Sequence, residues 1–379
     1  MKNQYNISVT LTPVEHYFFG GENLNPDGTE NYLQHSLKLP QQTTLLGAMR
    51  FLLLQTADKS VFNNNKIQDK EEAKKLIGYK GFDMQPGQYG KITSLSEVLL
   101  WHHPSNKFYL PLLAWEDNKN KPICSIKKEK ETSGNYFWSQ SLNQTIPVSL
   151  SEYNYKKGVQ EYWISTNGQL KEEEIFSECI HAGNYKNKPD KKENDDDAYF
   201  KLCYYSLRKD FSFVFNMEVE DENIINKIID PIHNNKIINV GGRSKFICSI
   251  EKITNQSPKY ISEQTYNPYT DYIDSDFIKV VLSSDAYSME NPNLKTVYSI
   301  TFIKKLRFMK SKVDKTNAYY NTGTDIVKKR YGLEVSRLYN LIRRGSVFFF
   351  QKEKEEELET FLKNNAFQTI GYNKYHIIK

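Results

Sequence analysis

Apolar and polar residues alternate over Tyr5–Leu11. This period of two is typical of a strand with one buried face. The next segment with a clear pattern, Leu45–Leu54, follows Pro40 and is apolar almost all round, which predicts a buried helix. Thr43 or Thr44 is expected to cap its N-terminus. The chain is therefore predicted to begin with a strand and a buried helix.

The alternation returns near the middle of the chain. It covers Phe200–Arg208 and Phe211–Val219, which we expect to pair as a hairpin, and Phe246–Ile253. Glu220–Ile229 has helical spacing, and the glycine-containing segment Gly241–Lys245 follows it. Together with the opening strand and helix, these segments give the order βαββαβ, which is that of a ferredoxin-like domain.

A similar order of elements closes the chain. An acidic segment of helical spacing lies between strand patterns, and a glycine-containing segment precedes the last of them. The first helix of this second unit has a weaker pattern, and Asp325–Tyr331 is its candidate. The strand patterns cover Phe277–Ser283, Val335–Ile342, Val347–Phe350 and Tyr375–Ile378, with the helix at Lys352–Leu362.

We therefore predict an α+β protein with two ferredoxin-like (RRM-like) βαββαβ domains. The first covers residues 1–255 and carries a large insertion at about 58–200, and the second covers residues 256–379. The connection between Ile253 and Phe277 contains two prolines and several polar residues, as linkers do. Within the insertion, the charge run Lys186–Asp197 has no apolar residue and is expected to be a solvated loop.

Composition limits the possible functions. The 379 residues carry a net charge of +5, so a nucleic-acid site would have to come from local clustering of basic residues. Four cysteines lie far apart with no Cys-x-x-Cys pair, which favours reduced, buried thiols without disulfides. The adjacent His102 and His103 would point to opposite faces of a strand, which disfavours a shared metal. With no apolar segment of membrane-spanning length, we expect a cytoplasmic protein without metal or cofactor.

The segment Gly241–Lys245 is the best candidate for binding a phosphate. Glycine lets the backbone approach an anion closely, and successive N–H groups can cradle it. Arg243 and Lys245 would add positive charge, and Ser244 would add a hydroxyl group. The alternative is a helix C-cap that leads into a strand, with both basic side chains solvated.

Two further features are candidates for RNA contact. Arg50 lies on an otherwise apolar helix, so it must bind either an anion or a structural carboxylate. The stretch Lys304–Arg344 holds twelve lysines and arginines against three acidic residues, with four tyrosines interleaved. Charge and aromatic rings together are typical of single-strand binding. The alternative is an ordinary solvated face.

The chain resembles the RAMP superfamily, specifically the third subunit of type III-B CRISPR (Cmr) effector complexes. The segments that carry the resemblance occur in the family's order: YFFGGENL, LPQQTTLLGAMRFLL, HAGNY with AYFKLCYYSLRKDFSFVFNMEVE, NVGGRSKFICSIEKI and NLIRRGSVFFF. Two segments depart from the family pattern. Gly20-Gly21-Glu22 stands where the family usually has Phe-Arg-Asp-Gly, and Gly371-Tyr372-Asn373 is a reduced form of the last glycine loop.

The resemblance implies two ferredoxin-like domains, binding of the 5′ tag of the crRNA, and no catalytic residues. It also implies contact with the large polymerase-type Cmr subunit and with a neighbouring backbone RAMP subunit. The residues expected at RNA are Gly20, Gly21, Thr43, Thr44, Arg50, Gly241, Gly242, Arg243, Ser244, Lys245, Arg343, Arg344, Gly371, Tyr372 and Lys374.

Two alternatives remain at this point. One is an endoribonuclease of the same superfamily that processes CRISPR repeat RNA by general acid–base catalysis, for which His16, His35 or Lys374 would be the candidates. The other is a protein-interaction scaffold. The chain carries no P-loop and no Gly-x-Ser-x-Gly or His-Glu-x-x-His motif, which favours a binding subunit.

Overall fold

The structure is a computed structural model. It describes residues 5–20, 33–79, 81–82, 89–116, 121–128, 137–139, 143–146, 148–150, 153–154, 156–165, 168–184, 199–230, 234–241, 244–253, 277–287, 296–311, 333–354, 356, 360, 362 and 365–378. Several predicted features therefore lie outside the described residues. These are Gly21, Gly242, Arg243, the charge run Lys186–Asp197, the candidate helix Asp325–Tyr331 and the predicted domain boundary.

The opening strand β1 (Tyr5–Pro13) forms the middle of the large sheet. It pairs antiparallel with both β17 (Phe211–Val219) and β19 (Ser244–Lys252), and its residues Ile7, Val9 and Leu11 are fully buried. In spatial order the sheet is β14 (Gly168–Lys171), β13 (Gln160–Ser165), β7 (Lys107–Glu116), β6 (Leu99–His102), β17, β1, β19 and β18 (Lys236–Val240), while β5 (Ile92–Leu95) also pairs with β17 and β8 (Pro122–Ile123) with β7.

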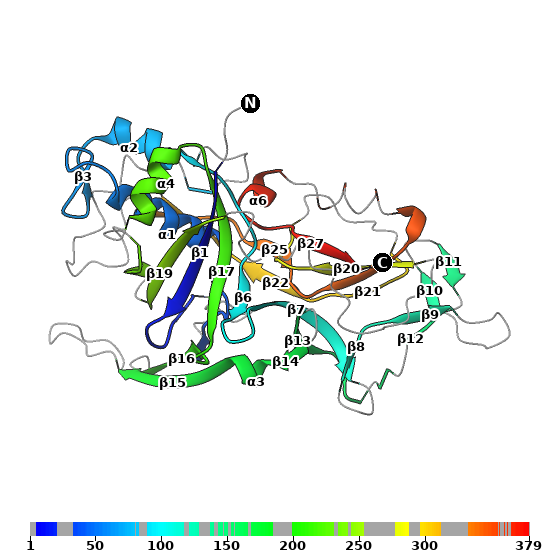
Figure 1. The fold of residues 1–379 in the computed structure, drawn as a ribbon. Helices are drawn as coiled ribbons and strands as arrows, with labels where there is room; N and C mark the ends of the chain where they lie inside the picture. Colours follow the sequence, from blue (N-terminus) through cyan, green and yellow to red (C-terminus); the bar gives the residue numbers. More distant parts are fainter. Residues whose placement is uncertain are drawn as a thin grey trace, which may run out of the picture.

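Helices cover one face of this sheet. Figure 1 shows α1 (Gln42–Gln55), α2 (Lys70–Ile77) and α4 (Glu222–Ile229) on the same side of β1, β17 and β19. The buried helix α1 is present as predicted, but its cap is not. The N-cap is Gln41, which makes no side-chain capping bond, and Thr43 and Thr44 lie inside the first turn. The short α3 (Glu172–Ile175) links β14 to the next strand.

The predicted hairpin of Phe200–Arg208 with Phe211–Val219 is wrong. Both segments are strands, but β16 (Tyr199–Leu207) belongs to a separate sheet, between β15 (Phe176–Asn184) and β2 (Leu33–His35). The alternating pattern identifies a strand without identifying its partner. Here β1, far away in sequence, takes the place beside β17.

A second sheet is formed by the C-terminal part of the chain. Its spatial order is β21 (Tyr298–Ile300), β26 (Val347–Gln351), β20 (Phe277–Leu282) and β27 (Tyr375–Ile378). The strand β25 (Tyr339–Ile342) pairs with β22 (Ile303–Leu306), whereas β26, the next strand along the chain, pairs with β20 and β21. The short helix α6 (Asn365–Thr369) precedes β27 in the chain.

The remaining described elements are small. They are the paired strands β3 (Phe62–Asn63) and β4 (Lys66–Ile67), β9 (Ile126–Lys128) and β12 (Val148–Leu150), β10 (Phe137–Ser139) and β11 (Gln144–Ile146), β23 (Met309–Ser311) and β24 (Leu333–Val335), and the 3₁₀ helix η5 (Lys352–Lys354). The fold is mixed α+β and rich in strands, which confirms the predicted class. Among the described residues, no helix has the length and apolarity needed to cross a membrane.

Candidate RNA-binding cleft

The N-terminus of α1 and the last glycine loop meet in the structure. The Gln42 side-chain amide donates hydrogen bonds of 2.8 Å to the carbonyls of Gly371 and Ser96. Tyr372 is fully buried, and its hydroxyl group donates to Gln41 at 3.0 Å. Four residues that were predicted to contact RNA therefore lie at one junction: Thr43, Thr44, Gly371 and Tyr372. Gly371 and Tyr372 are held there by protein contacts.

Gly241 directly follows β18, and Ser244 and Lys245 are the first residues of β19, which pairs with β18, so the segment follows a strand and not a helix. Gly241 has a φ of +67°, and a Cβ atom there would lie 2.6 Å from the Phe19 ring, so packing alone requires a glycine. The Ser244 hydroxyl accepts the Phe18 N–H at 2.8 Å and donates to its carbonyl at 3.3 Å. Lys245, the second residue of β19, is exposed.

Three more of the predicted residues lie outside the segment Gly241–Lys245. Arg50 is 6% exposed and donates to the Gly78 carbonyl at 3.2 Å, which ties α1 to the end of α2. Gly20 is exposed and follows the bridge between Phe19 and Leu37. The backbone N–H of Lys374 donates to the Ser284 hydroxyl at 2.9 Å.

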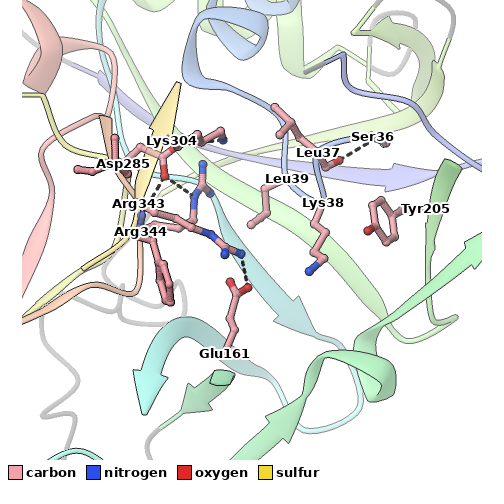
Figure 2. A pocket seen from close by; sticks show the side chains of 12 residues that line it. Ser36, Leu37, Lys38, Leu39, Glu161, Tyr205, Asp285, Lys304, Arg343 and Arg344 are labelled. Atoms are coloured by element: carbon pink, nitrogen blue, oxygen red, sulfur yellow. Dashed lines mark hydrogen bonds and ion pairs between the residues drawn. The ribbon is translucent and has the colours of Figure 1, made fainter. Parts of the chain in front are cut away.

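Arg343 and Arg344 line an open cleft with a volume of about 450 Å³. They lie in the turn between β25 and β26, where the chain crosses to the second sheet. Figure 2 shows Asp285 and Lys304 beside them, Glu161 below, and Lys38 with Tyr205 on the opposite wall. The lining side chains include four cations against two carboxylates. The cleft therefore carries excess positive charge, as a site for an anion requires.

Asp285 organises the inner wall of the cleft. It is fully buried and accepts the Arg344 backbone N–H at 2.9 Å, the Arg344 Nε at 3.4 Å and the Lys304 Nζ at 3.2 Å. Burial by itself would raise the pKa of Asp285, but the charges of Lys304 and Arg344 hold that pKa below its usual value. The carboxylate is therefore ionised at neutral pH and fixes both cations in place.

One nitrogen of Arg344 is not satisfied by this network. The side chain of Arg344 is 6% exposed, and its Nη1 is buried without a hydrogen-bond partner among the described residues. A buried, charged N–H group without a partner costs free energy that an anionic acceptor would recover. The neighbouring Arg343 forms an ion pair with Glu161 and remains 36% exposed.

The rim of the cleft adds apolar surface. Phe302 is 46% exposed and Ile303 is 62% exposed, although both are large apolar residues. On the opposite wall, burial and the hydrogen bond to Glu178 raise the pKa of Tyr205, so its hydroxyl group stays neutral. The Nζ of Lys38 lies 5.9 Å from the centre of the Tyr205 ring. The exposed ring is therefore that of Phe302, and an exposed aromatic ring beside fixed cations can hold a base and its phosphate together.

The sequence located the basic side of this cleft and missed the rest. The other lining residues come from segments far apart in the chain, so no sequence motif connects them. They include Lys38, Glu161, Tyr205 and Asp285. One signal was present, because Asp285 follows directly on the apolar strand β20 and its two serines. A carboxylate at the end of a buried strand needs a cationic partner.

The comparisons with known proteins identify a family. The model of the family described as CRISPR-associated protein (Cas_Cmr3) matches residues 9–379. No curated protein matches the chain.

Several solved structures contain a chain similar to this one. A chain of the cryo-EM structure of type III-B Cmr-beta bound to cognate target RNA and AMPPnP is 14% identical, with 97% of this chain and 95% of that chain covered and a TM-score of 0.47. The same assembly bound to cognate target RNA gives 14% identity, 98% and 96% coverage and a TM-score of 0.47. A chain of the Csm3–Csm4 subcomplex of the type III-A interference complex is 12% identical, with 90% and 92% covered and a TM-score of 0.33.

Proposed function

The chain belongs to the family of CRISPR-associated proteins described as Cas_Cmr3, and we propose that it is a non-catalytic subunit of a type III-B Cmr effector complex, where it binds the guide RNA near its 5′ end. The observation that carries this proposal is the cleft of Arg343 and Arg344. It offers a buried guanidinium nitrogen without a partner, excess positive charge and an exposed aromatic ring.

The chemistry of the cleft suits single-stranded RNA. Phosphate contacts by Arg344 and Lys304 would fix the position of the strand without reading its sequence. Phe302 would stack on a base, which every nucleotide permits. The exposed Lys245 at the start of β19 and Arg243, two residues before it in the sequence, are proposed as a second phosphate contact. The large polymerase-type subunit and a neighbouring RAMP subunit are the proposed protein partners.

The proposed fold is a pair of ferredoxin-like domains. The strand order supports it: in both sheets the first strand lies between the last strand of the unit and the strand that precedes the last helix. In the first sheet β1 lies between β17 and β19, and in the second β20 lies between β26 and β27. This is the order expected when a βαββαβ chain closes into one antiparallel sheet.

Titration of a fluorescent guide RNA, with its 5′ tag, against cleft variants tests the proposal. Phe302→Ala should weaken binding roughly 5- to 100-fold, because stacking is lost. Arg343→Gln should weaken binding and lower the log–log salt slope by about one unit. Glu161→Gln should strengthen binding, because it removes the carboxylate that pairs with Arg343. A change in this direction cannot come from damage to the fold.

Matched controls lie outside the cleft. Tyr79→Ala removes an aromatic ring that is 42% exposed just after the end of α2, and Lys227→Ala removes an exposed cation of α4. Both should bind RNA like the wild type. Equal affinity of all cleft variants would overturn the assignment of the site. The same reactions run on gels test the non-catalytic role, since cleavage of repeat RNA that is lost in a His16, His35 or Lys374 variant would favour the endoribonuclease.

A further inference from the structure

Three side chains with ligand atoms for a transition metal meet on the face of the β15–β16 ladder opposite Tyr205, which lines the arginine cleft. They are His16, in the bend after β1, and Cys179 and His181, both on β15. One nitrogen of each histidine and the Cys179 sulfur all lie within 4.8 Å of one another. We propose that His16, Cys179 and His181 form a Zn²⁺ site, with the fourth position open to water or another ligand.

The backbone explains why these residues meet. Cys179 and His181 are two apart on a strand, so both side chains lie on one face of the β15–β16 ladder. His16 is held over that face because the next residue, Tyr17, exchanges backbone hydrogen bonds of 2.7 and 3.1 Å with Tyr205 of β16. The site is therefore positioned by two fixed backbone pairings rather than by flexible side chains alone.

The distances suit a tetrahedral ion. The Cys179 sulfur lies 3.3 Å from the His181 Nε2. Tetrahedral zinc with ordinary Zn–S and Zn–N bonds separates a sulfur and a nitrogen ligand by about 3.6 Å. The rings of His16 and His181 are 5.9 Å apart and nearly perpendicular, at 71°. With all ligand atoms within 4.8 Å of one another on an exposed surface, we expect side-chain rotations to close the set around one ion.

The types of ligand favour zinc. Thiolate and imidazole together suit a borderline-soft ion such as Zn²⁺, whereas Mg²⁺ and Ca²⁺ require oxygen ligands. Packing does not account for the cluster, because His16 and His181 are exposed and Cys179 is half-exposed, in contrast to the buried Cys124, Cys203 and Cys248. The sequence pointed away from zinc because it lacks a Cys-x-x-Cys pair, and Cys-x-His with a histidine some 160 residues earlier carries no motif.

Cobalt provides a direct test on the full chain. Co²⁺ added to the metal-free protein should give a thiolate-to-cobalt charge-transfer band and tetrahedral d–d bands, and one equivalent of Zn²⁺ should remove them. Cys179→Ser should abolish the charge-transfer band although three other thiols remain. His16→Ala and His181→Ala should each weaken Zn²⁺ binding roughly tenfold or more, the scale of affinity loss that altering even a secondary contact causes. His35→Ala, an exposed histidine on β2, should bind as the wild type.

Thiol alkylation provides a second measurement that needs no variant. Iodoacetamide should modify Cys179 in the metal-free chain, as mapped by mass spectrometry, and Zn²⁺ should protect it until a chelator is added. Octahedral cobalt spectra, or Zn²⁺ binding unchanged by all three substitutions, would overturn the site. Alkylation of Cys179 at the same rate with and without Zn²⁺ would overturn it as well.

Discussion

Asp285 has no contact with solvent, and yet it carries a charge at neutral pH. An ionised carboxylate in such a place is stable only when it is paired and hydrogen-bonded. Lys304 and Arg344 supply both, and in return Asp285 holds these cations at the wall of the cleft. The same burial lowers the pKa of Lys304, which Asp285 opposes. The positions of the proposed phosphate-binding side chains thus depend on a residue that no RNA would touch.

The depressed pKa of Asp285 makes a prediction about acid stability. A group whose pKa is lower in the folded state stabilises that state above its unfolded pKa, and the contribution is lost as the pH falls toward the folded pKa. Asp285→Asn should therefore reduce the free energy of unfolding at pH 7 by about 3–5 kcal/mol, because two cations lose their partner. The difference from wild type should shrink below about pH 4. Urea midpoints at pH 7 and pH 3 measure both.

Asp58→Asn is the matched control, since Asp58 is exposed. It should leave the urea midpoint almost unchanged at either pH. A loss for Asp285→Asn that is equally large at pH 3 would mean that the side chain acts through its shape, and not through its charge.

At this scale the sequence singled out particular cations but did not indicate the carboxylates that they contact. The pair Arg343 and Arg344 stands out in a basic stretch, but Glu161 and Asp285 lie 182 and 59 residues away from them. The sequence singled out Gly241 for anion binding, whereas the structure gives it a packing reason, the ring of Phe19. A local pattern reports that a residue is unusual, whereas the atom that it faces depends on the tertiary fold.

Among the elements, the junction between α1 and the last glycine loop is tightly packed. Gly371 has a φ of +88°, and a Cβ atom there would lie 2.0 Å from the Gln42 amide and 2.2 Å from the Ser96 carbonyl. By contrast, Gly47 lies on the exposed side of α1, with no described atom within 4 Å of its Cβ position. A glycine is therefore required at position 371, beside α1, but not at position 47, within it.

Substitution by alanine should therefore change the stability in opposite directions at the two positions. Gly371→Ala should destabilise the protein by about 2 kcal/mol or more, because the left-handed conformation and the backbone clash both oppose a Cβ atom. Gly47→Ala should stabilise it by roughly 0.5–1 kcal/mol, because alanine loses less conformational freedom in a helix. Thermal melting of the two variants measures both. A neutral Gly371→Ala would contradict the tight contact of this loop with α1.

Elements were predictable from the sequence, whereas their pairing was not. The strand patterns at Phe211–Val219 and Val347–Phe350 are correct, and the apolar helix after Pro40 is present. The predicted hairpin of Phe200–Arg208 with Phe211–Val219 failed because a neighbour in sequence was assumed to be the neighbour in the sheet. The strand that begins the unit, β1, takes that place beside β17, as β20 does beside β26 in the second sheet. Burial over a long sequence separation decides this, and alternation cannot report it.

At the scale of the whole molecule, the two sheets are joined by shared cores. One cluster unites α1 with Phe308, Tyr339 and Phe367 from the C-terminal part, and a second unites β7 and β13 with β20 and β26. The buried Lys279 of β20 donates to the Cys124 carbonyl at 2.9 Å, and the Leu113 N–H donates to the Gly345 carbonyl at 2.9 Å. Two units with so much common interior are expected to unfold together.

The four tryptophans allow this to be tested, since Trp101, Trp115, Trp138 and Trp163 all precede residue 255. Their fluorescence reports the first part of the chain, whereas far-UV circular dichroism reports both sheets. In urea the two signals should change at one midpoint.

Phe350→Ala, in the core of the second sheet, should reduce the free energy of unfolding by roughly 3–5 kcal/mol and lower the midpoint of both signals equally. Leu52→Ala in α1 is the converse variant and should do the same. If Phe350→Ala moved the circular dichroism without the fluorescence, the halves would fold independently. The arginine cleft, lined from both of them, would then open when either one unfolds.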